Sequence, residues 1–315
     1  MTKSKKQMAD NPLKDKKIIS AVTNDLFRDR RMIRICSALS DFGANVTLIG
    51  IKKKNSQAVV NTNFSIHRFR IIFKSGILFY LEYNIKLFFY LLFKEFDIVN
   101  ANDADTLLAC FLATKIKNKK IVFDAHEYFT GVPELKNRNF KKGIWKTIED
   151  KILPNIDKNY TVSDSVKNAY ERDIGTSFLT IRNFPDSNNF NKIIRPNIDS
   201  KGDIYLGYVG VLNKGRGLEQ AIRILQKFEN RVKLFLIGGG DLEKELKSLV
   251  DKLNLKSRVE FSGWVQPKQI PDILSKVHIG LNLLDGESEN YKYSLANKVF
   301  DYLHMGIPCL TMNFL

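Results

Sequence analysis

Short apolar runs alternate with amphipathic stretches along most of the 315-residue chain. In the first half, the runs predict buried strands at 16–23 ("KKIISAVT"), 45–51 ("NVTLIGI"), 96–102 ("FDIVNAN"), 120–126 ("KIVFDAH") and 158–163 ("KNYTVS"). The stretches between them predict helices at 29–42, before 113 and around 145–153, with Gly43 ending the first. Because apolar strands that alternate with helices form parallel sheets, the pattern predicts an α/β fold with a doubly wound sheet.

The same cycle starts again after an Asn- and Pro-rich stretch at 182–203. It predicts strands at 204–210, 232–238, 259–263, 277–284 and 307–314, and helices at 218–228, at 242–253, from Pro267 and in the stretch before Gly306. The expected plan is a polar tail at 1–16, a domain at 17–185, a linker at 186–202 and a second domain at 203–315. We expect the ligand crevice between the two domains, beyond the carboxyl ends of their strands.

The most apolar stretch, residues 76–93, reads "GILFYLEYNIKLFFYLLF". A helix that spans a membrane needs about 20 mostly apolar residues, and Glu82, Asn84 and Lys86 interrupt this one, so a spanning helix is not expected. Two interpretations remain open. The helix packs in a core or between domains, or it dips into a bilayer interface beside basic residues.

The chain carries a formal charge of +16, most of it before residue 190. Such a balance indicates an anionic partner, which could be nucleic acid, a lipid surface or a phosphorylated metabolite, unless the lysines only solvate the surface. The three cysteines are widely separated and form no zinc motif, which favours a reducing, cytoplasmic compartment. The lysine-rich start is followed by no apolar segment typical of a signal peptide.

A glycine-rich loop, "GVLNKGRG", follows the first strand of the second domain. Its glycines (Gly210, Gly215 and Gly217) would let the backbone approach an anion, and Lys214 and Arg216 supply positive charge at a helix start. The loop therefore predicts phosphate binding, without a Walker or GxGxxG motif. A second glycine run, "LIGGGD" at 236–241, is explained by a tight turn, with ligand contact as the alternative.

The stretch "SLANKVFDYLHMGIP" predicts a helix with a polar face. Asn297 and Asp301 are four residues apart and would share that face. Tyr293 and Asp301 are eight apart, which spans about 12 Å of helix and suits an elongated nucleotide sugar. Ser294 is the expected N-cap and Gly306 the expected stop. The alternative is an ordinary amphipathic core helix, which would leave the polar face unexplained.

Seven segments resemble those of glycosyltransferase family 4, in that family's order. They are "NDADTL", "VFDAHEYFTGVPEL", "IDKNYTVSDSV", "RNFPD", "GYVGVLNKGRGLEQAI", "LIGGGDLEKEL" and "SLANKVFDYLHMGIP". Each is weak alone, but together they cover nearly the whole chain. The resemblance implies the GT-B fold, in which two Rossmann-like domains face each other.

The resemblance also implies an activity. Such enzymes transfer a sugar from a nucleotide diphosphate sugar with retention of anomeric configuration, and they need no metal or other cofactor. The implied acceptor is a glycan or a lipid-linked sugar, in cell-surface polysaccharide or glycoconjugate synthesis. Apart from the resemblance, the basic runs "KKK" at 52–54, "KNKK" at 117–120 and "KNRNFKK" at 136–142, beside the apolar stretch 76–93, predict a cytoplasmic enzyme with peripheral contact at an anionic inner membrane face.

Site residues follow from the resemblance position by position. Asp301 stands where the family holds the donor ribose, and Arg216 where it binds the diphosphate. The other implied donor-binding positions are Lys214, Tyr293, Ser294, Leu295, Asn297 and Lys298, with Ser294 and Leu295 offering backbone N–H groups.

On the acceptor side, His126 matches a histidine near the reacting sugar; the alternative is a structural histidine. Asp25, Arg28, Asp103 and Glu127 lie in the acceptor-side domain, 17–185.

The chain also departs from the family pattern. Tyr293 replaces the first of two glutamates, Asp301 replaces the second, and Val211 stands where many members have arginine. The chain ends at Leu315, so the second domain is expected to be incomplete. An alternative function is therefore an inactive member or a fragment that serves as a binding or scaffold subunit. Nucleic-acid binding, for which "RFRIIFK" at 68–74 is the candidate, is not expected.

Overall fold

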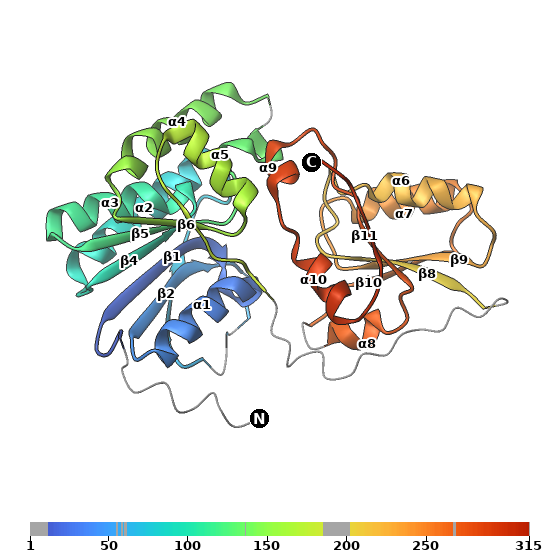
Figure 1. Cartoon of the computed structure of the whole chain (residues 1–315), viewed down its shortest axis with the longest axis horizontal. Helices are drawn as coiled ribbons and strands as arrows, with labels where there is room; N and C mark the ends of the chain where they lie inside the picture. The colour runs from blue at the N-terminus through green and yellow to red at the C-terminus, as the bar shows by residue number, and fades with distance from the viewer. Residues whose placement is uncertain are drawn as a thin grey trace. The chain divides into compact units, whose positions relative to one another are not determined.

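The computed structural model describes residues 12–54, 56–57, 59, 62–135, 137–184, 202–266 and 269–314, without the side chains of Arg28, Arg30 and Glu134. The chain divides into two compact units, Met1–Arg182 and Asn183–Leu315, called here the N-terminal and C-terminal domains. Each contains a parallel sheet with helices packed on it, which confirms the expected α/β class (Figure 1). Of the expected linker at 186–202, only Gly202 is among the described residues.

The N-terminal domain is built on a seven-stranded parallel sheet in the order β3-β2-β1-β4-β5-β6-β7. Its strands are β1 (Lys17–Asp25), β2 (Asn45–Lys52), β3 (Ser65–Arg70), β4 (Ile98–Asn102), β5 (Lys120–Ala125), β6 (Lys158–Thr161) and β7 (Leu179–Thr180). The chain runs outward from β1 to β3 and then returns to β4 on the other side of β1. Ligands of doubly wound sheets bind at such a reversal, beyond the carboxyl ends of the strands.

Five α-helices connect these strands. They are α1 (Arg30–Asp41), α2 (Gly76–Phe93), α3 (Ala104–Lys117), α4 (Asn139–Ile152) and α5 (Asp164–Ile174). Crossovers between parallel strands are right-handed, so helices that lead in opposite directions across the sheet cover opposite faces. Accordingly, α2, α3 and α4 lie on one face and α1 lies on the other (Figure 1).

The first helix shows how the local sequence sets an element. The Asp29 carboxylate accepts a hydrogen bond from the backbone N–H of Met32 and caps the helix, and Gly43 ends it with a φ of +90°. Met32 and Cys36 are fully buried against the sheet. The predicted helix at 29–42 and its glycine stop are therefore confirmed.

The apolar helix α2 forms the crossover from β3 to β4. By length and composition, it is the one candidate for a membrane-crossing helix among the described residues. Only Tyr83, Leu87 and Leu91 are buried, which is 17% of the helix, so it is not packed inside a core. Tyr83 also donates a hydrogen bond at 2.6 Å to the carbonyl of Val22 in β1, which fixes the helix to the sheet.

The segment "RFRIIFK" forms the second half of the edge strand β3 and the stretch after it. The Phe69 ring packs edge-on against Tyr83 and Tyr90 of α2, with centroids 5.8 Å away in each case. Arg68 donates to the carbonyl of Gln57 at 2.8 Å. The aromatic ring between the basic residues is thus occupied inside the domain, which argues against a stacking platform for nucleic-acid bases.

The C-terminal domain has a five-stranded parallel sheet in the order β10-β9-β8-β11-β12. Its strands are β8 (Ile204–Val209), β9 (Val232–Ile237), β10 (Val259–Gly263), β11 (Ile279–Asn282) and β12 (Cys309–Thr311). Its helices are α6 (Leu218–Ile224), α7 (Glu243–Lys252), α8 (Ile270–Leu274), α9 (Glu289–Tyr293) and α10 (Asn297–His304). The short helix expected from Pro267 begins at Ile270, and Pro267 itself lies outside the described residues.

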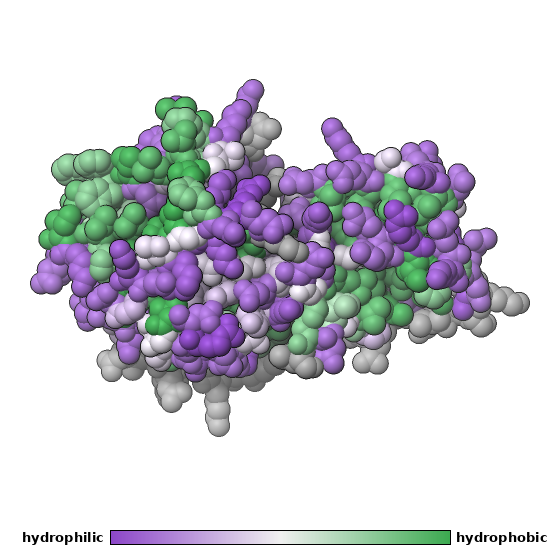
Figure 2. Space-filling view, turned by 90° about the horizontal axis from the view of Figure 1, so that it is seen from above, coloured by the Kyte–Doolittle hydropathy of each residue, from purple (hydrophilic) through white to green (hydrophobic). Residues whose placement is uncertain are grey.

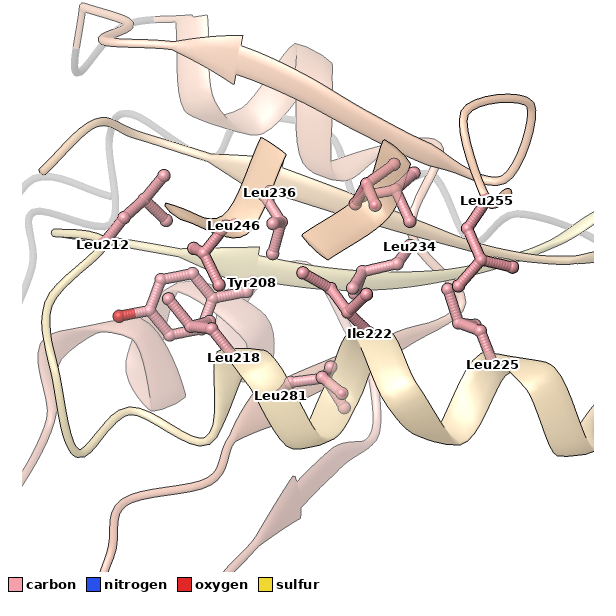
Figure 3. Close-up of a cluster of buried hydrophobic side chains, with 13 residues drawn as sticks. Tyr208, Leu212, Leu218, Ile222, Leu225, Leu234, Leu236, Leu246, Leu255 and Leu281 are labelled. Carbon is pink, nitrogen blue, oxygen red and sulfur yellow. The ribbon is translucent and has the colours of Figure 1, made fainter. Parts of the chain in front are cut away.

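A leucine-rich cluster fixes α6 and α7 to one face of this sheet (Figure 3). Leu218 and Ile222 of α6, Leu246 of α7 and Leu234 and Leu236 of β9 are each at most 2% exposed. Burial of an aliphatic side chain of this size stabilises a fold by about 1.5–3 kcal/mol. The cluster therefore holds the loop between β8 and α6 against a well-packed base.

The predicted terminal helix is wrong in one respect. Instead of one helix from Ser294, two helices form, α9 and α10, separated by residues 294–296. Ala296 occupies the N-cap of α10, while Ser294 caps the end of α9 and its hydroxyl donates to the carbonyl of Tyr291 at 3.2 Å. The span of about 12 Å from Tyr293 to Asp301 along one helix does not exist. Gly306, with a φ of +66°, follows α10 as predicted.

Candidate functional site

Polar residues of the N-terminal domain follow β4 and β5, which pair side by side in the sheet. Asp103 comes directly after β4 and His126 directly after β5. Parallel strands present their carboxyl ends at one edge, so the two residues become neighbours. The structure therefore brings together two of the residues that the sequence indicated.

Asp103 is held in an unusual backbone conformation, with φ +59° and ψ +167°. A non-glycine residue with positive φ is strained. Its carboxylate accepts from the backbone N–H of His126 at 2.8 Å and lies 2.9 Å from the Nδ1 of the same histidine. The strained backbone thus aims the carboxylate at His126 and fixes the orientation of the imidazole.

On its other side, the imidazole faces Asp124, whose carboxylate is fully buried. The Nε2 of His126 lies 3.7 Å from Asp124 Oδ2, too far for a hydrogen bond, and has no hydrogen-bond partner among the described residues. Asp124 is instead held by an ion pair with Arg31 and by the hydroxyl of Tyr160 at 2.8 Å. When Asp103 is ionised, Nδ1 carries the proton and Nε2 can accept one from a ligand hydroxyl.

The carboxylates of this cluster sit in a region that disfavours their charge. Burial, together with repulsion from Glu127, Asp105 and Asp124, holds the pKa of Asp103 well above its usual range. Burial raises the pKa of Asp105 to about 7, although a hydrogen bond from the Thr23 hydroxyl at 2.5 Å opposes the rise. Burial raises the pKa of Asp124 to about 6, although Arg31 opposes the shift. Groups that titrate near neutral pH are typical of sites that handle protons.

The other predicted acceptor-side residues lie at or after the ends of β1 and β5. Asp25 ends β1, and its carboxylate accepts from the hydroxyl of Ser56 at 2.7 Å and lies 3.9 Å from Arg68. Arg28 lies in a short 3₁₀ turn after β1. Glu127 follows His126 and acts on the cluster through its charge on Asp103.

In the C-terminal domain, the loop after β8 places Arg216 over the ring of Tyr291, 4.7 Å from its centroid. The Tyr291 hydroxyl donates to the carbonyl of Lys214 at 3.3 Å, so this tyrosine connects the loop to α9. The Nε of Arg216 is buried without a hydrogen-bond partner in the described part of the chain. Lys214 itself is exposed.

Lys298 of α10 is the least usual residue of this domain. It is 7% exposed, and its ammonium lies 3.5 Å from the centroid of the Tyr208 ring. The ammonium has no hydrogen-bond partner among the described residues. Burial and the nearby charge of Arg216 hold the pKa of Lys298 well below its usual range. A buried cation with only a ring beneath it is costly, and an anion placed beside it would relieve that cost.

The remaining predicted donor residues lie around this pair. Asp301 is 8% exposed and is three residues from Lys298 on α10, where its charge partly opposes the fall in the pKa of Lys298. Asn297 is exposed and accepts from the Asn183 amide at 3.2 Å. Tyr293 ends α9, and Ser294 and Leu295 lie in the break before α10.

The glycine turns of this domain have packing reasons. A side chain at Gly238 would come within 2.0 Å of the carbonyl oxygen of Gly210, because the turns after β8 and β9 touch. A side chain at Gly215, where φ is +80°, would meet Asp285 and Tyr291 at 2.7 Å. The tight-turn interpretation of "LIGGGD" therefore suffices. Gly210 differs, since the nearest atom on its open side is the Lys298 ammonium at 3.5 Å.

The described residues contain no group of three or more His, Cys, Asp or Glu side chains that could hold a metal ion. Sequence reasoning missed four residues that shape the two clusters: Arg31, Tyr160, Tyr208 and Tyr291. Arg31 stands in the run "TNDLFRDRR" at 23–31, but nothing in that run distinguishes it from Arg28. Tyr160 and Tyr208 sit in predicted strands whose apolar pattern already explained them as core, and Tyr291 sits in a polar stretch for which no element was predicted.

Two family models match the chain. The model described as "Glycosyltransferase Family 4" matches residues 29–185, and the model described as "Glycosyl transferases group 1" matches residues 189–289. The first covers α1 to the end of the N-terminal domain, including Asp103 and His126. The second covers the loop with Arg216 but ends before α10.

A curated relative is the lipopolysaccharide core biosynthesis glycosyltransferase LpsD of Rhizobium meliloti, 30% identical over 97 residues. That match covers 30% of this chain and only 27% of the relative. Among solved structures, Anabaena HepE in complex with UDP and glucose has a TM-score of 0.69 and 16% identity, over 93% of this chain and 80% of HepE. Sucrose-phosphate synthase of Thermosynechococcus elongatus has a TM-score of 0.72 and 15% identity, over the same shares. Likeness at this identity shows the fold.

Proposed function

Because the chain belongs to glycosyltransferase family 4, with the GT-B fold, we propose that it transfers a sugar from a nucleotide diphosphate sugar to a glycan or lipid-linked acceptor, with retention of configuration. The proposed setting is the synthesis of a cell-surface polysaccharide or glycoconjugate. The similarity to LpsD, named for lipopolysaccharide core biosynthesis, supports this setting, and HepE, solved with UDP and glucose, supports a nucleotide sugar as the donor.

The observation that carries the proposal is the ammonium of Lys298, buried beside Arg216 with no hydrogen-bond partner among the described residues. The two cations repel each other, and neither forms an ion pair with a residue of the described chain. A diphosphate would supply two negative groups to this place and form charge-assisted hydrogen bonds with both residues. We assign the diphosphate of the donor to Lys298 and Arg216, with Lys214 and the backbone of Ser294 and Leu295 nearby in sequence.

The reaction places most of its new charge on this diphosphate. The bond between the anomeric carbon and the phosphate oxygen breaks, and the acceptor oxygen forms a new bond to the same face of that carbon. The acceptor hydroxyl gives its proton to the leaving phosphate oxygen, so that atoms and charge balance without a metal or other cofactor. Arg216 and Lys298 stabilise the departing phosphate more strongly than the ground state, which lowers the barrier.

His126 is the proposed contact of the N-terminal domain with the reacting sugars. With Asp103 ionised, its carboxylate holds the N–H at Nδ1 of the imidazole, and Nε2 can accept a hydrogen bond from a sugar hydroxyl. Glu127 and Asp103 are the acidic groups next to it. For the donor, Asp301 is the proposed partner of the ribose hydroxyls and Tyr293 of the transferred sugar, with Asn297 near the ribose.

The experiment is a thermal-shift screen with nucleoside diphosphates, their sugars and inorganic pyrophosphate. A ligand that binds only the native state at 100 times its dissociation constant adds about 2.7 kcal/mol, a shift of roughly 5–10 °C for a domain of this size. We expect one nucleoside diphosphate to give the largest shift and pyrophosphate a smaller one. A folded protein that responds to none of them would contradict the donor assignment. NMR of the product's anomeric configuration tests retention.

A further inference from the structure

The outward face of α2 is apolar along its whole length. One stripe of the helix, at Tyr83, Leu87 and Leu91, is buried on the domain. The residues of α2 that are exposed to more than a third of their surface are all apolar, at 48–86% exposure: Ile77, Leu78, Leu81, Ile85, Phe89 and Phe93. A surface helix of a soluble domain normally presents charged and polar residues on its outward side, whereas α2 presents apolar residues there.

The polar side chains of α2 are turned away from this stripe and used inside the domain. Glu82 accepts from the backbone N–H groups of Ile72 and Phe73, and Lys86 donates to Glu82 at 2.5 Å and to the carbonyl of Arg70. Asn84 donates to the carbonyl of Asp105 in α3 at 2.7 Å. The helix thus satisfies these polar groups within the domain, and although the Lys86 side chain stays 38% exposed, the most exposed residues of α2 are all apolar.

The apolar face continues onto the neighbouring helices. On α3, Leu108, Leu112 and Ile116 repeat every fourth residue and are 39–66% exposed. On α4, Phe140 is 77% exposed and Ile144 is 36% exposed. An edge-on contact of Tyr80 with Trp145, at 5.1 Å, joins α2 to α4. Figure 2 shows hydrophobic side chains gathered on this side of the N-terminal domain. The eleven exposed residues named here on α2, α3 and α4 are called the apolar face.

Lysines border the apolar face at the helix ends. Lys74 precedes α2 and Lys94 follows it, while Lys115 lies in the last turn of α3 and Lys119 and Lys120 follow that helix; all five are exposed. Lys117 is turned inward and donates to the last carbonyls of α2. The acidic Glu82 is paired with Lys86, the exposed Glu95 with Lys17, and Asp97 with Lys119 at 3.5 Å, so that Lys119 is the one of the five with an acidic partner among the described residues. The border therefore has an excess of positive charge.

We propose that the apolar face docks the chain on the surface of an anionic lipid bilayer, with α2 lying in the plane of the interface. A helix of 18 residues is about 27 Å long, so six apolar side chains reach the acyl boundary along one line. The bordering lysines meet anionic headgroups at the same depth. A second copy of the chain fits less well, since the net charge of +16 and the like-charged borders would repel. The inference concerns where the chain works and does not depend on the donor site.

The test is flotation of the purified full chain with vesicles of phosphatidylcholine alone and of phosphatidylcholine with phosphatidylglycerol. We expect binding to the mixed vesicles at low salt, and binding at least tenfold weaker to phosphatidylcholine alone. Salt near 0.5 M shortens the Debye length to about 4 Å and should weaken the first interaction. No binding to the mixed vesicles at low salt would overturn the proposal.

Two matched variants locate the surface. Leu81→Ser, Ile85→Ser and Phe89→Ser together should reduce vesicle binding at least tenfold without lowering the unfolding temperature, because these side chains are exposed. The control carries Phe42→Ser, Ile224→Ser and Phe228→Ser, which are equally exposed apolar residues away from the apolar face, and should bind like the wild type. Equal losses in both variants would contradict the assigned face.

A charge variant tests the border. Lys115→Gln, Lys119→Gln and Lys120→Gln should remove most of the preference for phosphatidylglycerol, whereas the exposed trio Lys244→Gln, Lys252→Gln and Lys256→Gln should not. Light scattering gives the oligomeric state of the same samples. If the wild type binds no vesicles and forms a stable dimer that the serine variant breaks, the proposal is wrong and the apolar face binds a second copy of the chain.

Discussion

In the N-terminal domain, buried Asp124 lies between Arg31 and the hydroxyl of Tyr160, whereas in the C-terminal domain the buried ammonium of Lys298 lies over the Tyr208 ring alone. The first charge is paired by its own protein, beside an imidazole whose orientation Asp103 fixes. The second is unpaired among the described residues and stands beside another cation. Since an unpaired buried charge is costly, the difference indicates which cluster is complete and which one requires a ligand.

The largest effect is expected from removing a cation of the C-terminal pair Lys298 and Arg216, called here the unpaired cluster. Arg216→Ala should lower the rate of sugar transfer, or of donor hydrolysis, by about 10²–10³-fold, because it removes charge stabilisation of the leaving diphosphate. The fold should be kept, since Arg216 lies over the Tyr291 ring and forms no ion pair with a described residue. Arg223→Ala, an exposed arginine on α6, is the control. Unchanged transfer and hydrolysis in Arg216→Ala would remove the assignment.

A smaller effect is expected from the N-terminal cluster of Asp103, His126 and Asp124, called here the paired cluster. Asp103→Asn replaces the carboxylate that orients His126, so kcat/KM should fall by about 10–100-fold and its pH profile should change. Asp103 acts through the histidine and is a positioning residue. The control is Asp150→Asn, an exposed acid in an i,i+4 pair with Lys146. If Asp103→Asn kept the wild-type pH profile, the carboxylate would have no role in holding the imidazole.

The unpaired cluster should also take up protons when it binds its ligand. The pKa of Lys298 is depressed in the free protein, and a bound diphosphate would raise it, so between the two values binding adds up to about one proton. Calorimetry of nucleoside diphosphate binding in two buffers with different ionisation enthalpies, repeated over a series of pH values below the ordinary lysine pKa of 10.5, measures this uptake. Lys214→Met, which removes an exposed lysine, should leave it unchanged. Absence of uptake would mean that Lys298 does not contact the diphosphate.

The smallest expected effect is a change in the stability of the N-terminal domain when Asp105, next to the paired cluster, is replaced. Asp105 has a folded pKa of about 7, above its ordinary value of 3.8, so the folded state binds the extra proton. This contribution to stability is present below pH 3.8 and is lost as pH rises through about 7. Asp105→Asn should therefore raise the free energy of unfolding by about 1–2 kcal/mol at pH 8 and by less at pH 5. Chemical unfolding at both pH values measures it, and an equal change at both would contradict the pKa.

Much of the fold followed from local pattern. The strands at 17–25, 45–52 and 204–209 and the helix at 76–93 were predictable because their apolar runs are long and bounded by turn residues. The edge strands β3 and β7 and the helix α5 were not predicted. β3 is half-buried throughout and has no apolar run of its own, and β7 is two residues long.

The site was harder to predict, since its residues meet through tertiary structure. The pairing of Asp103 with His126 depends on β4 and β5 lying side by side, which the sequence implied only as a sheet. The burial of Lys298 was not predictable, because the same spacing fits an exposed helical lysine. The break between α9 and α10 is likewise set by packing of the 294–296 segment, where the sequence has no glycine or proline.

The central claim, that Lys298 is a buried cation waiting for an anionic ligand, is tested most directly by thermal unfolding of the wild type and of Lys298→Met, each with and without the nucleoside diphosphate selected by the screen. Methionine keeps the packing on Tyr208 and removes the charge. Without nucleotide, we expect the variant to unfold at a higher temperature than the wild type. The nucleotide should raise the unfolding temperature of the wild type by roughly 5–10 °C and that of the variant by far less. A variant that is less stable without nucleotide, and that gains as much from it as the wild type, would contradict the account.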